Sequence, residues 1–539
     1  MKLKKNQTTY QKKLPIGEAE IRNAARLLRE YKKGKASLET RIVEDEQWWR
    51  LRHRELEREE TAGPKAVSAW LFNSLISKHA DVMDSFPEAS VLPRERDDEE
   101  EAKKLSGVIP AILEYNGFEQ IYSNNWWYKL KHGSAAYGVF WNSEAENGLG
   151  EIKIKKIDLL NIFWEPGITE LDESRNLFIV DLKDTDVLES EYPFLRGINL
   201  HSAVDVKQYI YDDTVDTSDK TLVVDWYYKK RTKEGKTVLH YCKFVGETLL
   251  FASENNLEYA ENGWYEHGEY PIVFDSLFPE EGTPAGFGYI AVTKNPQMFI
   301  DKLNQAILEN AMMAAKPRYF AKISAGVNES EFLDWKKPIV HVEGDINEER
   351  LRPISTAPLP AGSINILRMK IDELKETSSN QDFSRGNAVS GVTAASAIEA
   401  LQEAASKTSR DMLMGSYRAF VKINYLCIEL IRQFYTELRS FRVTQSDGTF
   451  GFADYSNEKL SKKNTRRPVF DISVKAHKKS PYSRISQNEM AKELFRIGFF
   501  NPEHGIEALS ALELMDFEGK SSVEAKIREN IQHLRGELG

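Results

Sequence analysis

One helical pattern in the sequence is long enough to constrain the architecture of the whole chain. Over residues 396–438, apolar side chains recur every three or four positions and so lie on one face of an α-helix. They are Ala397, Leu401, Ala404, Met412, Phe420, Ile423, Cys427, Leu430, Phe434 and Leu438. A helix of about 45 residues is roughly 67 Å long, several times the ordinary length. The pattern therefore predicts a long spine, and Gly415 and Ser416 near its middle are a pair that permits a kink.

A small, polar, glycine-containing tract precedes this helix. It lies within "SSNQDFSRGNAVSGVTAASAIEAL" and offers almost no side chain that a core could bury. Before it, residues 363–377 carry a second helical stripe, formed by Ile364, Leu367, Ile371 and Leu374. The tract therefore connects two helices, and on its own it is typical of an ordinary solvent-exposed connection.

A small strand-rich module lies between two helices earlier in the chain. The first helix is expected to begin at Asn295, which can cap it, with Pro296 in the first turn, and to end before Pro317. Residues 317–361 then hold short strand patterns punctuated by Pro and Gly, and the helix of residues 363–377 follows. Two helices that flank such an insert indicate a stalk with a tip.

The remaining segments predict an α+β fold. Three helical patterns come first. One covers residues 18–60, the second ends at Pro87, and the third is broken at Pro110 and stops at Gly133. Mostly antiparallel strand patterns follow, beginning with a hairpin around Asn147 and the glycine after it. From about residue 480 the sequence predicts three short amphipathic helices.

Composition excludes several classes of protein. The chain of 539 residues is 41% apolar and 29% charged, contains no run of 18 apolar residues and begins without a signal-peptide pattern, so we expect no membrane partner. Its two cysteines suit a reducing cytoplasm. A net charge of −10 argues against a protein that grips nucleic acid mainly by neutralising phosphates. Basic segments near residues 462–484 are expected to be solvated loops.

No catalytic motif is complete in the sequence. Gly235 and Gly519 each begin a "GK[ST]" triplet, but the first glycine of a phosphate-binding loop is replaced by Lys230 and Leu514. Zinc-protease, C-x-x-C and nucleophile-elbow motifs are missing, and His341 is expected to be structural. The sequence therefore predicts no enzyme, no cofactor and no metal, although a nuclease built from dispersed carboxylates stays open.

Several stretches, in their order, resemble tailed-bacteriophage portal proteins. "NNWWYKLKHGSAAYGVFWNSE" and "GEIKIKKIDLLNIFWEPGITELDESRNLFIV" are similar to that family's passage from a long helix into a strand, with Glu165-Pro166 in place of an Asp-Pro turn. "YPIVFDSLFPEEGTPAGFGYIAVTKNPQMFIDKLNQAILENAMMAAKPRYF" resembles the start of its stem, with Pro296-Gln297 at the helix start. "GVTAASAIEALQEAASKTSRDML" and "ISQNEMAKELFRIGFFNP" resemble its post-loop helix and its crown.

The resemblance implies a portal-type architecture with a mixed α/β wing, a two-helix stem, a clip, a kinked spine and a helical crown. Its implied boundaries are 1–293 and 439–479 for the wing, 294–316 and 362–379 for the stem, 317–361 for the clip, 380–395 for a tunnel loop, 396–438 for the spine and 480–539 for the crown. It further implies a ring of twelve subunits at one capsid vertex of the virion, assembled in the host cytoplasm. The implied partners are double-stranded DNA, the terminase large subunit, a head-completion adaptor, the major capsid protein and a scaffolding protein.

The resemblance also assigns candidate site residues. In the tunnel loop, Gly386, Gly391, Ser384 and Ser390 supply mobility, and polar side chains can meet phosphates without regard to sequence. The DNA-facing candidates are Asn380, Gln381, Ser384, Arg385 and Asn387. The partner-binding candidates in the clip are Arg318, Lys322, Trp335, Lys336 and Lys337, and the hinge candidates are Gly415 and Ser416. The strand "KPIVHVEG" is a template for edge-to-edge pairing.

Other interpretations remain at this point. A metal-dependent DNA-processing enzyme and a different virion structural protein are the alternatives, and only the first of these would cut DNA. Trp48-Trp49 and Trp126-Trp127 fit core and subunit packing better than base stacking.

Overall fold

A computed structural model shows how the chain folds. It describes residues 14–56, 65–198, 204–208, 214–232, 235–315, 360–378, 395–444, 450–457 and 468–478, residues 200, 210 and 211, and shorter pieces within 318–354 and 492–531. The chain is α+β and forms two compact units. The first unit comprises Met1–Asp45, Ser77–Gly288 and Glu399–Gly539, and the second comprises Glu46–Ile76 and Tyr289–Ile398.

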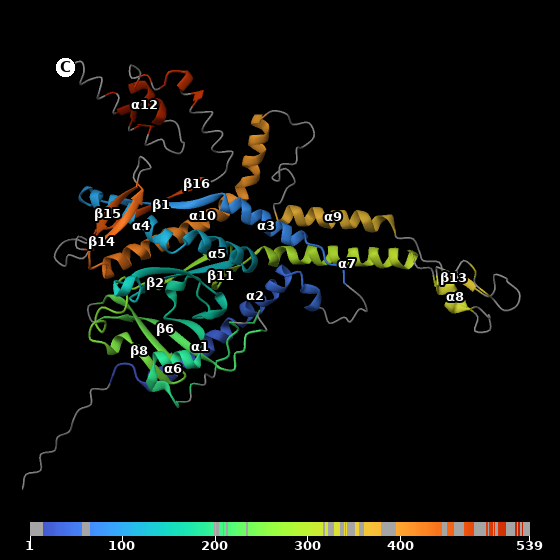
Figure 1. Cartoon of the computed structure of the whole chain (residues 1–539), viewed down its shortest axis with the longest axis horizontal. Helices are drawn as coiled ribbons and strands as arrows, with labels where there is room; N and C mark the ends of the chain where they lie inside the picture. Colours follow the sequence, from blue (N-terminus) through green and yellow to red (C-terminus); the bar gives the residue numbers. More distant parts are fainter. Residues whose placement is uncertain are drawn as a thin grey trace, which may run out of the picture. The chain divides into compact units, whose positions relative to one another are not determined.

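A five-stranded antiparallel sheet is the largest sheet of the first unit. Its order is β4-β5-β6-β7-β8, built from Ile162–Trp164, Asn176–Asp184, Lys220–Arg231, Thr237–Val245 and Thr248–Ala252. Helix α1 (Glu18–Gly34) covers one face with Ile21, Ala24, Leu28 and Tyr31, which follow the helical spacing. Helix α6 (Thr185–Glu191) packs on the other face beside Val223 and Val245, because alternate side chains of a strand point to opposite faces. Figure 1 shows β6 and β8 of this sheet with α1 and α6 beside them.

A second, three-stranded sheet has the order β3-β2-β9. Strands β2 (Ser134–Asn142) and β3 (Glu151–Ile157) form the expected antiparallel hairpin, and β9 (Ile272–Ser276) pairs with β2. Helix α5 (Phe118–His132) packs against β2 and ends at Gly133, whose φ of 93° is left-handed. A Cβ at Gly133 would come within 2.2 Å of the Phe287 backbone, so this helix end requires glycine.

Smaller sheets join distant parts of the first unit. Strand β1 (Ser85–Pro93) pairs antiparallel with β16 (Phe470–Lys478), and α4 (Glu99–Tyr115) packs against β1. The other two-stranded sheets of this unit are β10–β11 (Phe278–Glu280 and Thr283–Phe287) and β14–β15 (Arg439–Thr444 and Phe450–Tyr455). Near the C-terminus, α12 (Gly505–Glu513) belongs to an apolar cluster with Phe499 and Ile527, which come from the other two helical patterns predicted there.

The long helix α10 spans Ala395–Phe434 and is continuous. Met412, Phe420, Ile423, Cys427 and Leu430 of the predicted stripe are buried, which confirms it over this part of the helix. Leu438 is exposed, so its assignment to the stripe is wrong, because the helix ends before it and β14 begins. Figure 1 shows that α10 changes direction along its length.

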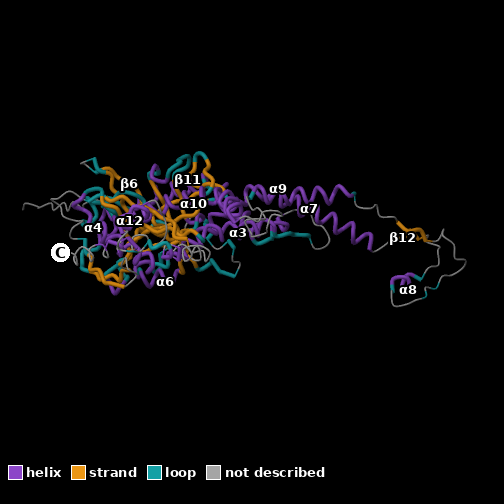
Figure 2. The backbone as a smooth tube through the Cα atoms, turned by 90° about the horizontal axis from the view of Figure 1, so that it is seen from above, coloured by secondary structure: helices purple, strands orange, loops and turns teal. Residues whose placement is uncertain are grey.

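The second unit contains the predicted helix pair. Helices α7 (Tyr289–Ala315) and α9 (Ala361–Thr377) pack side by side, as Figures 1 and 2 both show. Between them, β12 (Arg318–Ala321) and β13 (Leu351–Ile354) form an antiparallel pair, and α8 (Glu329–Leu333) is a short helix that the sequence did not predict. Helices α2 (Ala36–Trp49) and α3 (Trp70–Met83) run through the boundaries of the two units.

Two predicted boundaries are wrong. Helix α7 begins at Tyr289 and not at Asn295, so Pro296 lies inside the helix. Pro110 lies inside α4 on its exposed side, where water can satisfy the carbonyl that proline leaves unpaired. The break comes instead at Gly117, whose φ of 61° ends the helical path. In the part of the chain that the structure describes, no helix has the length and apolar character needed to cross a bilayer.

Candidate functional site

A buried carboxylate fixes the base of the α7–α9 pair within the second unit. Asp301 is on α7 and fully buried, and its Oδ1 accepts hydrogen bonds from the Ser68 backbone N–H at 2.9 Å and from the Ser68 hydroxyl at 2.6 Å. Its Oδ2 lies 2.9 Å from His53 Nε2. Because a buried carboxylate is costly unless its oxygens are hydrogen-bonded, this set of donors stabilises one arrangement of the chain.

Two glutamines extend the same attachment along α7. Gln297 lies one turn before Asp301, and its amide donates to the Ser68 carbonyl at 2.8 Å and accepts from the Leu71 backbone at 3.0 Å. Gln305, one turn after Asp301, accepts from the Ala66 backbone at 2.5 Å. Three side chains on one face of α7 therefore hold the segment that leads into α3.

The α7–α9 pair carries large apolar side chains on its surface. Met312 is 62% exposed and Met369 is 64% exposed, and they belong to a larger exposed set: Phe299, Leu308, Met312 and Met313 on α7, and Ile364, Ile366 and Met369 on α9. Several large apolar side chains exposed on one helix pair are typical of a surface that another chain covers.

A buried ion pair attaches α10 to the first unit. Lys129 on α5 donates to Asp275 Oδ1 on β9 at 2.6 Å and to the Ser416 hydroxyl on α10 at 2.8 Å. Ser416 in turn donates to Asp275 Oδ2 at 2.6 Å. The Lys129 and Asp275 side chains are 1% and 2% exposed, so three elements meet in one closed hydrogen-bonded triad.

The surroundings of this triad set its electrostatics. Burial lowers the pKa of Lys129, and the neighbouring Asp275 carboxylate opposes that shift. The ammonium also lies 4.3 Å from the centre of the Trp126 ring, a favourable cation–π distance. Gly415 beside Ser416 leaves room for a Cβ, since the nearest atom would be the Ser276 carbonyl oxygen at 3.8 Å. Steric fit therefore does not require glycine at position 415.

The predicted site residues fall into three groups. The tunnel-loop candidates Asn380, Gln381, Ser384, Arg385 and Asn387 lie outside the described residues, as do Lys322, Trp335, Lys336 and Lys337 of the clip. Arg318 is on β12, where the structure describes its backbone paired with Ile354. Gly415 and Ser416 lie within α10, and their role as a hinge stays a prediction.

Both helices that adjoin the predicted loop are attached within their own units. Ser378 follows α9 and is fully buried, and its hydroxyl donates to Ser74 Oγ at 3.2 Å in the second unit. Ser416 holds α10 in the first unit. These hydrogen bonds fix the positions of α9 and α10.

Sequence reasoning missed the residues that make these attachments. They include Lys129, Asp275, His53 and Asp301. A single charged residue in an amphipathic pattern usually faces solvent, so the sequence pattern does not distinguish a buried one. The one available signal was the spacing of Gln297, Asp301 and Gln305, which places three polar side chains on one helical face.

Among the described residues, no three carboxylate, histidine or cysteine side chains lie close enough together to hold a metal ion. In comparisons with known proteins, a family model described as "Phage P22-like portal protein" matches residues 84–537, most of the 539-residue chain. A search of curated proteins finds no match.

Proposed function

The chain belongs to the phage P22-like portal protein family of virion structural proteins, and on that premise we propose that its subunits form a closed ring whose channel passes double-stranded DNA. The observation that carries the proposal is the α7–α9 pair with its short β12–β13 sheet, inside the matched range. In this proposal the helix pair would be the stem and the small sheet would be part of the clip. The ring would lie at one capsid vertex and serve in genome packaging and ejection.

Exposed apolar side chains support assembly into a ring. Met312 and Met369 are more than half exposed in the single chain, and a neighbouring subunit that packs against α7 and α9 would remove such side chains from water. A closed ring repeats one heterologous interface, so it leaves no free edge that could grow into a filament.

The predicted tunnel loop would contact the DNA. Residues 380–391 contain one arginine, Arg385, among small and polar residues. One arginine per subunit becomes a ring of positive charge, in which each contact is weak and independent of sequence while their sum steadies the duplex. Weak contacts of this kind permit sliding.

The finer partners belong to the same proposal. The clip, with Arg318, Lys322, Trp335, Lys336 and Lys337, would face the terminase large subunit during packaging and a head-completion adaptor afterwards. The wing would face the major capsid protein and a scaffolding protein, with assembly in the host cytoplasm. Energy for translocation would come from the terminase, since the chain lacks a complete phosphate-binding loop.

Native mass spectrometry tests ring formation. The purified protein should give a single closed oligomer, and twelve subunits are expected. Met312→Glu should prevent assembly, because it places a charge in the buried interface. Leu257→Glu is the matched control, since Leu257 is an exposed leucine of the first unit. Monomers or dimers alone at micromolar wild-type concentration would contradict the proposal.

The loop is tested separately from the ring. Arg385→Ala, or deletion of residues 387–391, should leave the oligomer intact and impair DNA packaging or retention. Arg196→Ala, at an exposed arginine of the first unit, controls for loss of one positive charge. Failure of the loop variants to assemble would show that the loop is structural, and unchanged packaging and retention would show that it does not contact DNA.

A further inference from the structure

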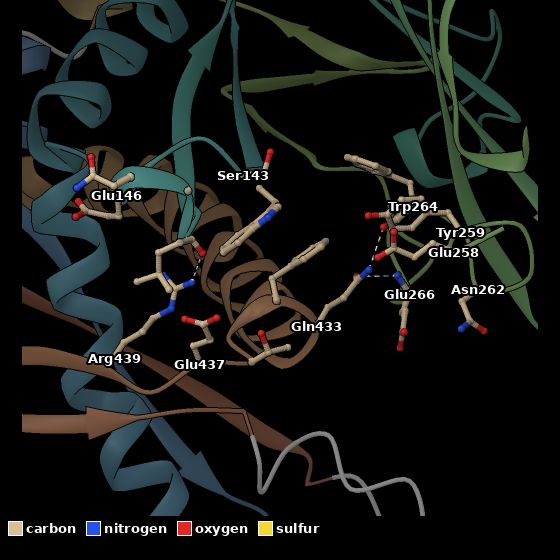
Figure 3. A pocket seen from close by; sticks show the side chains of 17 residues that line it. Ser143, Glu146, Glu258, Tyr259, Asn262, Trp264, Glu266, Gln433, Glu437 and Arg439 are labelled. Carbon is tan, nitrogen blue, oxygen red and sulfur yellow. Dashed lines mark hydrogen bonds between the residues drawn. The ribbon is translucent and has the colours of Figure 1, made fainter. Parts of the chain in front are cut away.

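A cavity of about 790 Å³ lies within the first unit, where three segments of the chain meet (Figure 3). One wall is the connection between β2 and β3, around residues 143–149. A second wall is residues 258–266, which follow β8. The third is the C-terminal turn of α10 and the chain that continues to Arg439. This cavity is remote in sequence from the predicted tunnel loop and clip.

Specific bonds hold the three walls together. The Gln433 side chain of α10 donates to the Trp264 carbonyl at 3.0 Å and accepts from the Glu266 backbone N–H at 3.1 Å. The Phe434 ring stacks on Trp141 of β2 with a centroid distance of 4.7 Å and an interplanar angle of 5°. The cavity is therefore preformed, which lowers the cost of ordering a ligand site on binding.

Arg439 holds the first wall in place, and groups of the protein itself balance its positive charge. Its guanidinium donates to the Leu149 carbonyl at 2.8 Å and to the Gly150 carbonyl at 2.7 Å. It lies 3.4 Å from a carboxylate oxygen of Glu151 and 4.0 Å from the centre of the Tyr435 ring. The positive charge of Arg439 is therefore directed at the protein itself.

The remaining charge of the cavity is negative. Four carboxylates line it, from Glu146, Glu258, Glu266 and Glu437. Figure 3 shows Glu146 and Glu437 on one side, with Glu258 and Glu266 across from them. A concave surface lined by one sign of charge concentrates ions of the opposite sign.

Two further properties define the class of ligand. The carboxylates are spread around the cavity, and no three of them come close enough together to hold a metal ion, so a small divalent cation does not fit. Aromatic rings also line the cavity, with Tyr259 and Trp264 centred 4.9 Å apart beside Glu258. Arginine and lysine side chains bind both to carboxylates and over aromatic faces.

From this geometry we infer that the cavity is a docking site for a lysine- and arginine-rich segment of a partner protein. Its volume lies within the usual range of pockets that enclose a small ligand, so it can hold a few residues of a peptide. The carboxylates on both sides give an extended basic segment a counterion at each side, and the aromatic rings receive its aliphatic stems and cationic heads. The site is independent of the proposed channel.

Fluorescence anisotropy with the purified full-length protein tests this inference. The probe is a fluorescein-labelled peptide of alternating glycine and arginine, and the matched probe carries glutamine in place of arginine. The arginine peptide should bind at least about tenfold more tightly at low ionic strength, and added salt should weaken it. The double variant Glu258→Gln/Glu437→Gln should bind the arginine peptide about tenfold less tightly than wild type.

The control variant is Glu44→Gln/Glu247→Gln, which makes the same change in net charge at exposed positions outside the cavity. Its affinity should stay within about twofold of wild type. Equal losses in the two double variants would show nonspecific attraction to an acidic protein and would overturn the inference, as would equal binding of the two peptides. Binding that emerges only after Lys462, Lys463, Arg466 and Arg467 are changed to glutamine would assign the cavity to the chain's own basic segment, and so would also overturn it.

Discussion

Replacing Lys129 by methionine should weaken the attachment of α10 by about 3–5 kcal/mol, the usual cost of removing one partner of a buried ion pair. The variant leaves the Asp275 carboxylate, which is 2% exposed, with the Ser416 hydroxyl and without its counterion. Asp275→Asn should cost a similar amount, because the buried ammonium of Lys129 then has no opposing charge. Methionine is chosen because it keeps most of the lysine's length.

The double variant Lys129→Met/Asp275→Asn should recover most of this loss. It buries no charge, and replacing both members of a buried pair is often close to neutral. We therefore expect an interaction free energy of at least about 2 kcal/mol in the double-mutant cycle. Ser416→Ala is a separate, milder change that should cost about 1–3 kcal/mol, since it removes a hydrogen bond to the carboxylate.

Hydrogen exchange read by mass spectrometry is the suitable assay, because unfolding of a large assembled protein is often irreversible and gives no equilibrium free energy. A loss of about 3 kcal/mol in local stability should speed amide exchange by about two powers of ten. The effect should appear in peptides from α5, β9 and α10, and α1 should serve as the unchanged reference. Single variants that each cost less than about 1 kcal/mol, with additive effects, would refute a dry ion pair at this position.

Three further expectations follow from the structure. Burial lowers the pKa of Lys35 to about 7, so between this pH and its ordinary pKa of 10.5 the unfolded chain binds a proton that the folded chain lacks. In that window the stability of wild type relative to Lys35→Met should rise by about 1.4 kcal/mol per pH unit, as denaturant titrations at several pH values would measure. Gly415→Ala should stabilise α10 by up to about 1 kcal/mol, and if bending at this position matters, packaging should fall while thermal stability rises. The purified protein should neither hydrolyse ATP nor cut DNA in the presence of divalent ions, and an ATPase activity abolished by Lys236→Ala or Lys520→Ala would contradict this.

Local patterns were sufficient for the elements whose signals lie within a short stretch of sequence. The apolar spacing around Phe420 and Cys427 correctly predicted α10, because a helix surrounded by other elements must bury such side chains. The turn after Asn147 correctly predicted the β2–β3 hairpin, since asparagine and glycine accept the positive φ angles that a tight turn needs.

Long-range pairing and buried polar contacts were not predictable in this way. Strand β1 was missed because its partner β16 lies near the other end of the chain, and two prolines in β1 are unfavourable for a strand. The true start of α7 was missed because no capping residue in the sequence marks it. The first two residues of the helix, Tyr289 and Ile290, are buried, so tertiary packing stabilises this turn. The residues of the predicted channel loop stay predictions, because their proposed role depends on a ring and not on contacts within one chain.

The two buried polar networks have a common consequence for the proposed function. Buried ionic groups contribute little net stability, but each permits only the arrangement in which its partners meet, so they are suited to fixing position. The Asp301 network holds α7, which packs on α9, and the Lys129–Asp275–Ser416 triad holds α10. The predicted tunnel loop joins α9 to α10, so a force that moving DNA applies to this loop would reach two helices that are each fixed within their own unit. If Gly386 and Gly391 give the predicted loop the mobility proposed for it, the loop would yield to the duplex while the helices on both sides keep their places.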